Sequence, residues 1–157
     1  MRLLCAVGSS DGALVVREAL ALVGDSVEVI ALHVIDERPR RDIESLRGPL
    51  RHISPERQRE LGQAEAAAGQ ATLAEAAAAA RDAGAQVTSF VSRLERGRPE
   101  QVIVAQARDV GADLVALRPR EHPASFPRIG PPSVGHTARF VVDHAPCPVL
   151  LLRIATH

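Results

Sequence analysis

Short apolar runs alternate along the chain with segments whose apolar residues recur at every third or fourth position. Such runs are typical of buried strands, and such spacing is typical of helices that lie on a sheet. The alternation of the two indicates repeated βα units. The predicted strands cover residues 3–7, 26–34, 86–91, 113–117 and 149–154. The predicted helices lie between Ser9 and Gly24, from Ser54 to Ala83, from Pro99 to Val110 and from Val134 to His144.

The predicted helix ends carry local signals. In Ser54-Pro55-Glu56 a hydroxyl can cap the helix, proline suits the first helical turn, and the carboxylate interacts favourably with the positive helix end. Ser9 and Ser10 can cap the first helix. Gly84 and Gly111 follow the second and third helices and predict where they end.

Right-handed crossovers would join these units into a doubly wound, five-stranded parallel sheet with helices on both faces. We expect the winding direction to change between the first and fourth strands, so that a ligand crevice lies between Gly8–Asp11 and residues 118–133. No repeat or domain boundary interrupts residues 1–157, which predicts a single α/β domain. Residues 37–54 form an irregular, arginine-rich connection, and residues 118–133 form a loop rich in proline and arginine.

The composition excludes several classes of protein. The formal net charge is +0, whereas a general nucleic-acid binder is clearly basic. No apolar run approaches the ~18 residues of a membrane span. The stretch MRLLCAVGSS is typical of a first strand and not of a signal peptide. We therefore expect a cytoplasmic protein that binds neither nucleic acid nor membrane.

Missing residue types narrow the chemistry further. All 19 basic residues are arginine, so a lysine-dependent phosphate loop or Schiff base is impossible. The chain has no Trp and no Tyr, which argues against a base-stacking platform. Cys5 and Cys147 lie in apolar runs and are expected to be reduced core thiols, with a disulfide or redox role as the alternative.

Three segments together resemble the universal stress protein family. The first is Leu3–Val7 with the serines after it, and the second is Gly97-Arg98-Pro99, a helix and Gly111–Val115. The third is Gly135, a helix and the stretch HAPCPVL at residues 144–150, which is close to a family signature. The resemblance implies an adenine nucleotide alpha hydrolase-like fold and a stress-response regulator that binds an unknown partner protein. It also implies a homodimer through the edge of the last strand, at Val149, Leu150, Leu151 and Leu152.

The resemblance also implies where ATP would bind and where this chain departs from the ATP-binding members. Those members have Gly-x-x-Gly after the fourth strand, nine further residues and then Gly-Ser or Gly-Thr. Here Arg118 and Glu121 fall on the first two glycines, and Pro119 has no N–H to donate. Gly135 is retained, but His136 replaces the hydroxyl residue and Thr137 follows one place later. After the first strand, Gly8 takes the place of an expected Asp, and Asp11 lies downstream.

The candidate ligand cleft comprises Val7, Gly8, Ser9, Val34, Arg118, Arg120, Gly135, His136 and Thr137. From these departures we predict a non-enzymatic regulatory homodimer that has lost ATP binding of the family type and needs no cofactor. The alternative is a sensor of ATP, AMP or a related anion. It would hold phosphate with arginine and histidine side chains, namely Arg118, Arg120, Arg128 and His136. Weak nucleotide hydrolysis is a third alternative.

Histidines and carboxylates suggest no further site. His122, His136 and His144 lack the spacing of a zinc set, so no metal site is predicted. His33 and Asp36 lie close together in sequence and could form an acid–base pair, but no nucleophile accompanies them. A structural role for both is therefore the preferred interpretation.

Overall fold

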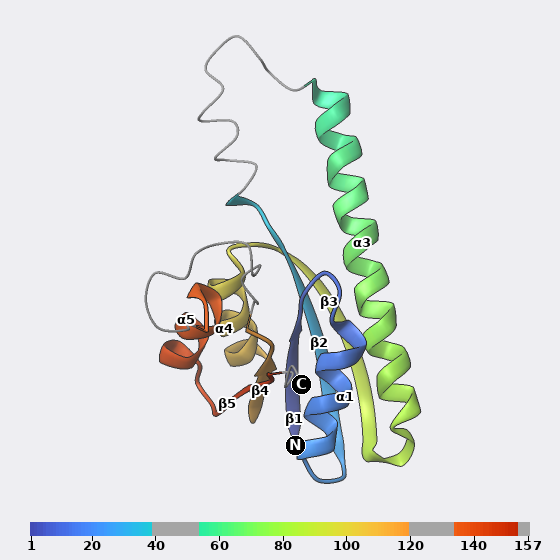
Figure 1. Ribbon diagram of the computed structural model, residues 1–157, viewed down its shortest axis with the longest axis vertical. Coiled ribbons are helices and arrows are strands. Elements are labelled where there is room, and N and C mark those ends of the chain that lie inside the picture. Colours follow the sequence, from blue (N-terminus) through green and yellow to red (C-terminus); the bar gives the residue numbers. More distant parts are fainter. Residues whose placement is uncertain (39–53, 120–133, 154–157) are drawn as a thin grey trace.

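The computed structural model describes residues 1–38, 54–119 and 134–153 and shows a central sheet between two layers of helices (Figure 1). The strands are β1 (Arg2–Val7), β2 (Val27–Asp36), β3 (Val87–Gly97), β4 (Leu114–Leu117) and β5 (Val149–Leu151). The helices are α1 (Gly12–Leu22), α3 (Pro55–Asp82), α4 (Pro99–Asp109) and α5 (His136–His144), with a short 3₁₀ turn, η2 (Gly84–Gln86), before β3. Each predicted strand and helix is therefore present.

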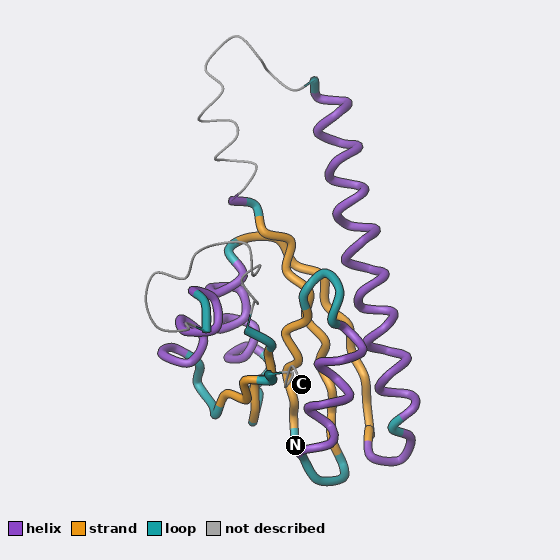
Figure 2. Tube along the Cα trace, viewed as in Figure 1, coloured by secondary structure: helices purple, strands orange, loops and turns teal. Residues whose placement is uncertain are grey.

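The five strands are parallel and lie in the order β3-β2-β1-β4-β5. Figure 2 shows the strands in orange between the purple helices. Strand β1 is central, with Leu4 beside Ile30 of β2 on one side and Val115 of β4 on the other. The chain winds outward from β1 to β3 and then returns to β4. The predicted change of winding direction between the first and fourth strands is confirmed.

Side chains point alternately to the two faces of the sheet and pack in two apolar layers. Val29 and Ala31 of β2 point toward α1 and α3, whereas Ile30 and Leu32 point toward α4 and α5. Strands buried on both faces are nearly continuous in apolar residues, as β1 and β2 are. The prediction of a buried strand at residues 26–34 is therefore confirmed.

Helices α1 and α3 approach closely at Gly12. A Cβ atom added there would lie 2.3 Å from the backbone oxygen of Thr72. The Thr72 hydroxyl in turn donates a 3.2 Å hydrogen bond to the carbonyl oxygen of Ser9. Because residue 12 is glycine, α3 can approach closely enough for Thr72 to hold the turn that leads from β1 into α1.

Helix α3 begins as the sequence predicts, since the Ser54 side chain accepts a hydrogen bond from the Arg57 N–H at 3.3 Å. Its first buried residue is Gly69, and the part before it extends well beyond the sheet (Figure 1). Helix α1 differs from the prediction. Its N-cap residue is Asp11 and not a serine, and no side chain caps it.

Strand β3 is longer than predicted, because it continues past Val91 to Gly97. The charged residues Arg93, Glu95 and Arg96 lie in this continuation. They are accommodated because β3 forms an edge of the sheet, where Arg93 reaches Gln106 on α4 and Arg96 reaches Gly62 on α3. The local sequence could not show that this strand lies at the edge.

Both cysteines are free thiols, as predicted. Cys5 is fully buried in β1, and burial raises the pKa of its thiol to about 12. Burial also raises the pKa of the half-buried Cys147 thiol, and the nearby Asp113 carboxylate raises it further. Among the described helices, none combines the length and hydrophobicity needed to cross a membrane.

Candidate functional site

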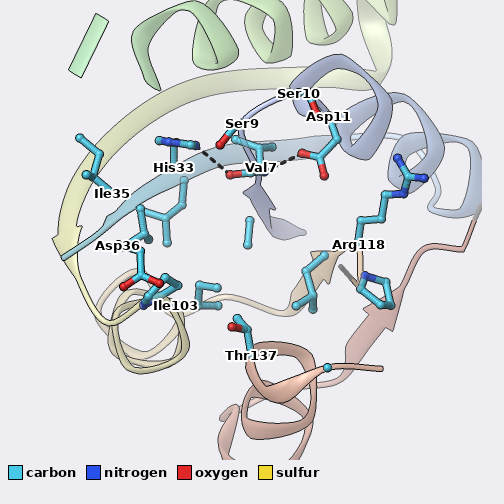
Figure 3. Close-up of a pocket in the computed structure, with 18 of the residues that line it drawn as sticks. Val7, Ser9, Ser10, Asp11, His33, Ile35, Asp36, Ile103, Arg118 and Thr137 are labelled. Carbon is cyan, nitrogen blue, oxygen red and sulfur yellow. Dashed lines mark hydrogen bonds between the residues drawn. The ribbon is translucent and has the colours of Figure 1, made fainter. Parts of the chain in front are cut away.

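A cleft of about 810 Å³ lies at the carboxyl ends of the strands, where the loops after β1 and β4 diverge. It is bounded by the ends of β1 and β2, the turn between β1 and α1, the middle of α3 and the N-terminal ends of α4 and α5 (Figure 3). Eight of the nine predicted cleft residues line it: Val7, Gly8, Ser9, Val34, Arg118, Gly135, His136 and Thr137. Arg120 lies outside the described residues, as do Glu121, His122 and Arg128. Ligand binding by the nine predicted cleft residues stays a prediction.

Both the side chain and the backbone of Asp11 hold the turn between β1 and α1. The Gly8 N–H donates to Asp11 Oδ1 at 2.6 Å, and the Val15 N–H donates to the Asp11 carbonyl oxygen at 2.9 Å. A Cβ atom on Gly8 would lie 3.2 Å from Asp11 Oδ2. Although Asp11 is displaced along the sequence from the family's Asp position, its carboxylate still lines the cleft.

His33 lies at the cleft floor on the α3 side of β2 (Figure 3). It is 7% exposed, and its Nδ1 lies 3.0 Å from the Val7 carbonyl oxygen. Because a carbonyl oxygen only accepts, Nδ1 carries the proton. Gly69 of α3 leaves room for the ring, since a Cβ there would lie 2.8 Å from His33 Cδ2.

Asp36 belongs to the other face of β2 and accepts from Arg38, with Nη2 2.7 Å from Oδ2. His33 and Asp36 therefore serve different layers, and the structure does not join them as an acid–base pair. This supports the structural role preferred for both.

Glu100 is the residue that the sequence analysis missed. It follows the first residue of α4 and is only 2% exposed, beside the cleft wall. Its Oε1 lies 3.4 Å from Arg38 Nη1, 3.5 Å from His136 Nε2 and 3.7 Å from Arg98 Nε. Its Oε2 is buried and accepts no hydrogen bond from the described residues. One carboxylate thus ties together the end of β2 and the starts of α4 and α5.

The start of α5 combines backbone and side-chain features. Gly135 has a positive φ of 84°, which favours glycine. His136, with 69% of its side chain exposed, directs Nε2 toward Glu100 and not freely into the cleft. Its neighbour Thr137 lines the cleft (Figure 3).

The charges on the described lining are mixed. The carboxylates belong to Asp11, Asp36 and Glu65, and the guanidinium groups belong to Arg38 and Arg118. Arg38 is already engaged by Asp36 and Glu100. The described part of the cleft therefore has no excess of positive charge to attract a polyanion.

The predicted dimer edge is placed only in part. Val149, Leu150 and Leu151 form β5 at the end of the sheet and are half-buried. Leu152 is instead 4% exposed within the core, and its N–H donates to the Leu117 carbonyl oxygen at 3.0 Å. Leu152 is therefore a core residue of the single chain, and the dimer edge at residues 149–152 stays a prediction.

No group of three or more His, Cys, Asp and Glu side chains in residues 1–38, 54–119 and 134–153 is arranged to hold a metal ion. His136 and His144 flank Phe140 on α5. The Phe140 and His144 rings stack with their centroids 4.1 Å apart. His144 Nδ1 also lies 2.9 Å from the Phe140 carbonyl oxygen. These histidines therefore have structural partners.

Comparisons with known proteins bear on the whole chain. Residues 1–153 match the sequence model of the Universal stress protein family. No curated protein matches the chain significantly. Universal stress protein UspA from Lactobacillus plantarum is 24% identical with a TM-score of 0.59, over 98% of this chain and 97% of that one.

Two further solved structures hold nucleotides. A universal stress protein family protein from Arabidopsis thaliana with AMP bound is 20% identical with a TM-score of 0.64, over 99% and 93% of the two chains. The universal stress protein from Archaeoglobus fulgidus in complex with dAMP is 21% identical with a TM-score of 0.60, over 98% of each chain. At these identities the likeness concerns the fold, and it confirms the predicted adenine nucleotide alpha hydrolase-like class.

Proposed function

The chain belongs to the universal stress protein family, and from that premise we propose that it is a non-enzymatic regulatory member that has lost ATP binding of the family type. The observation that carries the proposal is the sequence that directly follows β4. Arg118 and Pro119 occupy the start of the segment where ATP-binding members have glycines. Proline has no N–H to offer a phosphate, and the arginine carries a Cβ that glycine lacks.

The charges around the cleft support the same proposal. His136 stands where the family pattern has a hydroxyl residue, and its ring is paired with buried Glu100. A triphosphate at the start of α5 would have to compete with this carboxylate for the His136 ring. Asp11 and Asp36 add further negative charge to the lining.

Nucleotide titrations test the proposal directly. Thermal unfolding is measured with ATP, AMP and cyclic AMP, and with tripolyphosphate as a control for ionic strength. A ligand at 100 times its dissociation constant would raise the free energy of unfolding by about 2.7 kcal/mol. We expect no saturable rise with any nucleotide beyond that seen with tripolyphosphate. A saturable rise with ATP would overturn the loss of binding.

One observation favours a second candidate, an AMP-type sensor. The cleft remains open at about 810 Å³, and Arg118 and Thr137 line it. Relatives of the same fold are seen with AMP and dAMP. If AMP alone stabilises the chain, Arg118→Ala should remove the effect. Arg17→Ala, on the exposed surface of α1, should leave it unchanged. ATP turnover that Arg118→Ala abolishes would instead favour an enzyme.

We further propose a homodimer through β5. Val115 donates to the Pro148 carbonyl oxygen, and Leu152 donates to Leu117. Because backbone groups alternate in direction along a strand, those of Val149 and Leu151 face away from β4. Val149 and Leu151 therefore form an apolar edge, and such edges favour pairing with another strand.

The β5 interface predicts the effect of Leu151→Pro. Proline removes an outward N–H but no hydrogen bond to β4, so the fold should persist while pairing is lost. Sedimentation equilibrium should show a reduced mass for this variant, while circular dichroism remains that of the wild type. A folded variant with the mass of the wild type would contradict pairing through β5.

A further inference from the structure

The outer edge of β3 is the longest exposed strand edge in the described part of the chain. Strand β3 has 11 residues and pairs only with β2, whereas β5 at the other end of the sheet has three. The only irregularity in its pairing with β2 lies at Val27/Glu28, far from the carboxyl end. Long regular edges favour pairing with another strand unless charge, proline or a bulge prevents it.

The direction of the backbone groups on β3 follows from one hydrogen bond. The Glu37 N–H donates to the Gly97 carbonyl oxygen at 3.3 Å, so Gly97 faces β2. Since directions alternate along a strand, Arg93 and Glu95 also face β2. The N–H and C=O groups of Ser92, Leu94 and Arg96 then face outward.

The charged side chains of β3 lie over the faces of the sheet and do not cover this edge. Arg93 donates to Gln106 Oε1 on α4. Arg96 lies on the other face, where it donates to the Gly62 carbonyl oxygen and pairs with Glu65 of α3. Glu95 has the same parity as Arg93 and shares the α4 face.

We propose that β3 pairs antiparallel with β3 of a second copy of this chain, across a twofold axis at Leu94. This register places Arg93 opposite Glu95 of the second copy, and Glu95 opposite its Arg93. Opposite charges directly across two strands stabilise the pair, whereas like charges destabilise it. A twofold axis at Arg93, Glu95 or Arg96 would instead place that residue opposite its own copy, which sets like charges against each other. The charge pattern therefore favours the axis at Leu94.

The apolar residues fit the same register. Val91 is 46% exposed in the single chain and would lie opposite Gly97 of the second copy. Leu94 is half-buried against the α3 layer, and the two copies of its side chain would meet on the axis. The contact buries the one large apolar side chain that β3 exposes.

This interface is independent of the dimer proposed through β5, because β3 and β5 are opposite edges of one sheet. Association is therefore measured in the Leu151→Pro background by sedimentation equilibrium of the full chain, whose monomer mass is 16.7 kDa. If that background does not fold, the same variants are compared in the wild-type chain, where losing one interface lowers the assembly mass.

A charge exchange tests the register. Arg93→Glu and Glu95→Arg should each weaken self-association by about tenfold or more, because each sets two like-charged pairs across the axis. The double variant R93E/E95R should restore association to nearly the wild-type level. Ser92→Pro should abolish association without touching a hydrogen bond to β2. Arg17→Glu on α1 is the matched charge control and should have no effect.

Three results would overturn the proposal. In the first, the Leu151→Pro protein is folded and monomeric at its highest soluble concentration. In the second, the single charge reversals leave association unchanged. In the third, the double variant is as weak as the single ones, which would exclude the axis at Leu94.

Discussion

Gly12→Ala should lower the free energy of unfolding by about 3 kcal/mol, the upper part of the range for overpacked sites. The new methyl group would lie 2.3 Å from the Thr72 backbone oxygen and 3.0 Å from its Cγ2. A backbone oxygen cannot rotate away as a flexible side chain can, so α1 and α3 must move apart. Urea denaturation followed by circular dichroism measures the loss.

Helix propensity alone predicts the opposite sign, since alanine is favoured over glycine within a helix by up to about 1 kcal/mol. Gly24→Ala, just after α1, is the control for adding a methyl group where there is space, because a Cβ atom there meets nothing within 4 Å. It should change the free energy of unfolding by less than about 0.5 kcal/mol. Equal effects of the two substitutions would contradict the close approach of α1 and α3.

Alkaline pH should destabilise the protein mainly through one thiol. The pKa of Cys5 is raised from 9.0 to about 12 by burial in β1. The unfolded chain therefore releases the thiol proton above pH 9, while the folded chain keeps it until about pH 12. Stability is fully present below pH 9 and falls as pH rises to 12. Three pKa units correspond to about 4 kcal/mol in total.

The composition makes this effect measurable. The chain has no Lys and no Tyr, so the side chains that usually titrate in this range are missing. Cys5→Ala should have a nearly flat profile of unfolding free energy between pH 9 and 12, apart from a smaller contribution of Cys147. Cys147→Ala should keep most of the wild-type slope. If Cys5→Ala loses as much stability as the wild type, ionisation of the buried thiol is not the cause.

Much of the fold was predictable because its signals are local. Ser54-Pro55-Glu56 starts α3 where it should, and the apolar run before Val7 forms the central strand. The change of winding direction between the first and fourth strands was also predictable, since right-handed crossovers allow few topologies. Features set by distant parts of the chain were not predictable from the local sequence. The continuation of β3 to Gly97 depends on its edge position, and the burial of Leu152 depends on β4 and the core beyond it.

The candidate site was also predictable only where its sequence signals are local. Strand ends and the change of winding direction were enough to gather Val7, Val34 and Arg118 around one cleft. Glu100 was not predictable in the same way. A glutamate after proline at the start of a helix is explained by the helix dipole alone. Its burial arises from Arg38, which is 62 residues earlier, and from His136 on α5. No local pattern signals such a convergence.

Helix α3 projects beyond the sheet, and its residues before Gly69 are mostly exposed. Its 28 residues span about 42 Å at 1.5 Å each, so its length is not set by the strands it covers. Whole turns could be added to or removed from the part of α3 before Gly62 without altering a core contact. The first turns of α3 can therefore vary in number while the sheet stays the same. Variation among related chains can accumulate there at little cost to stability.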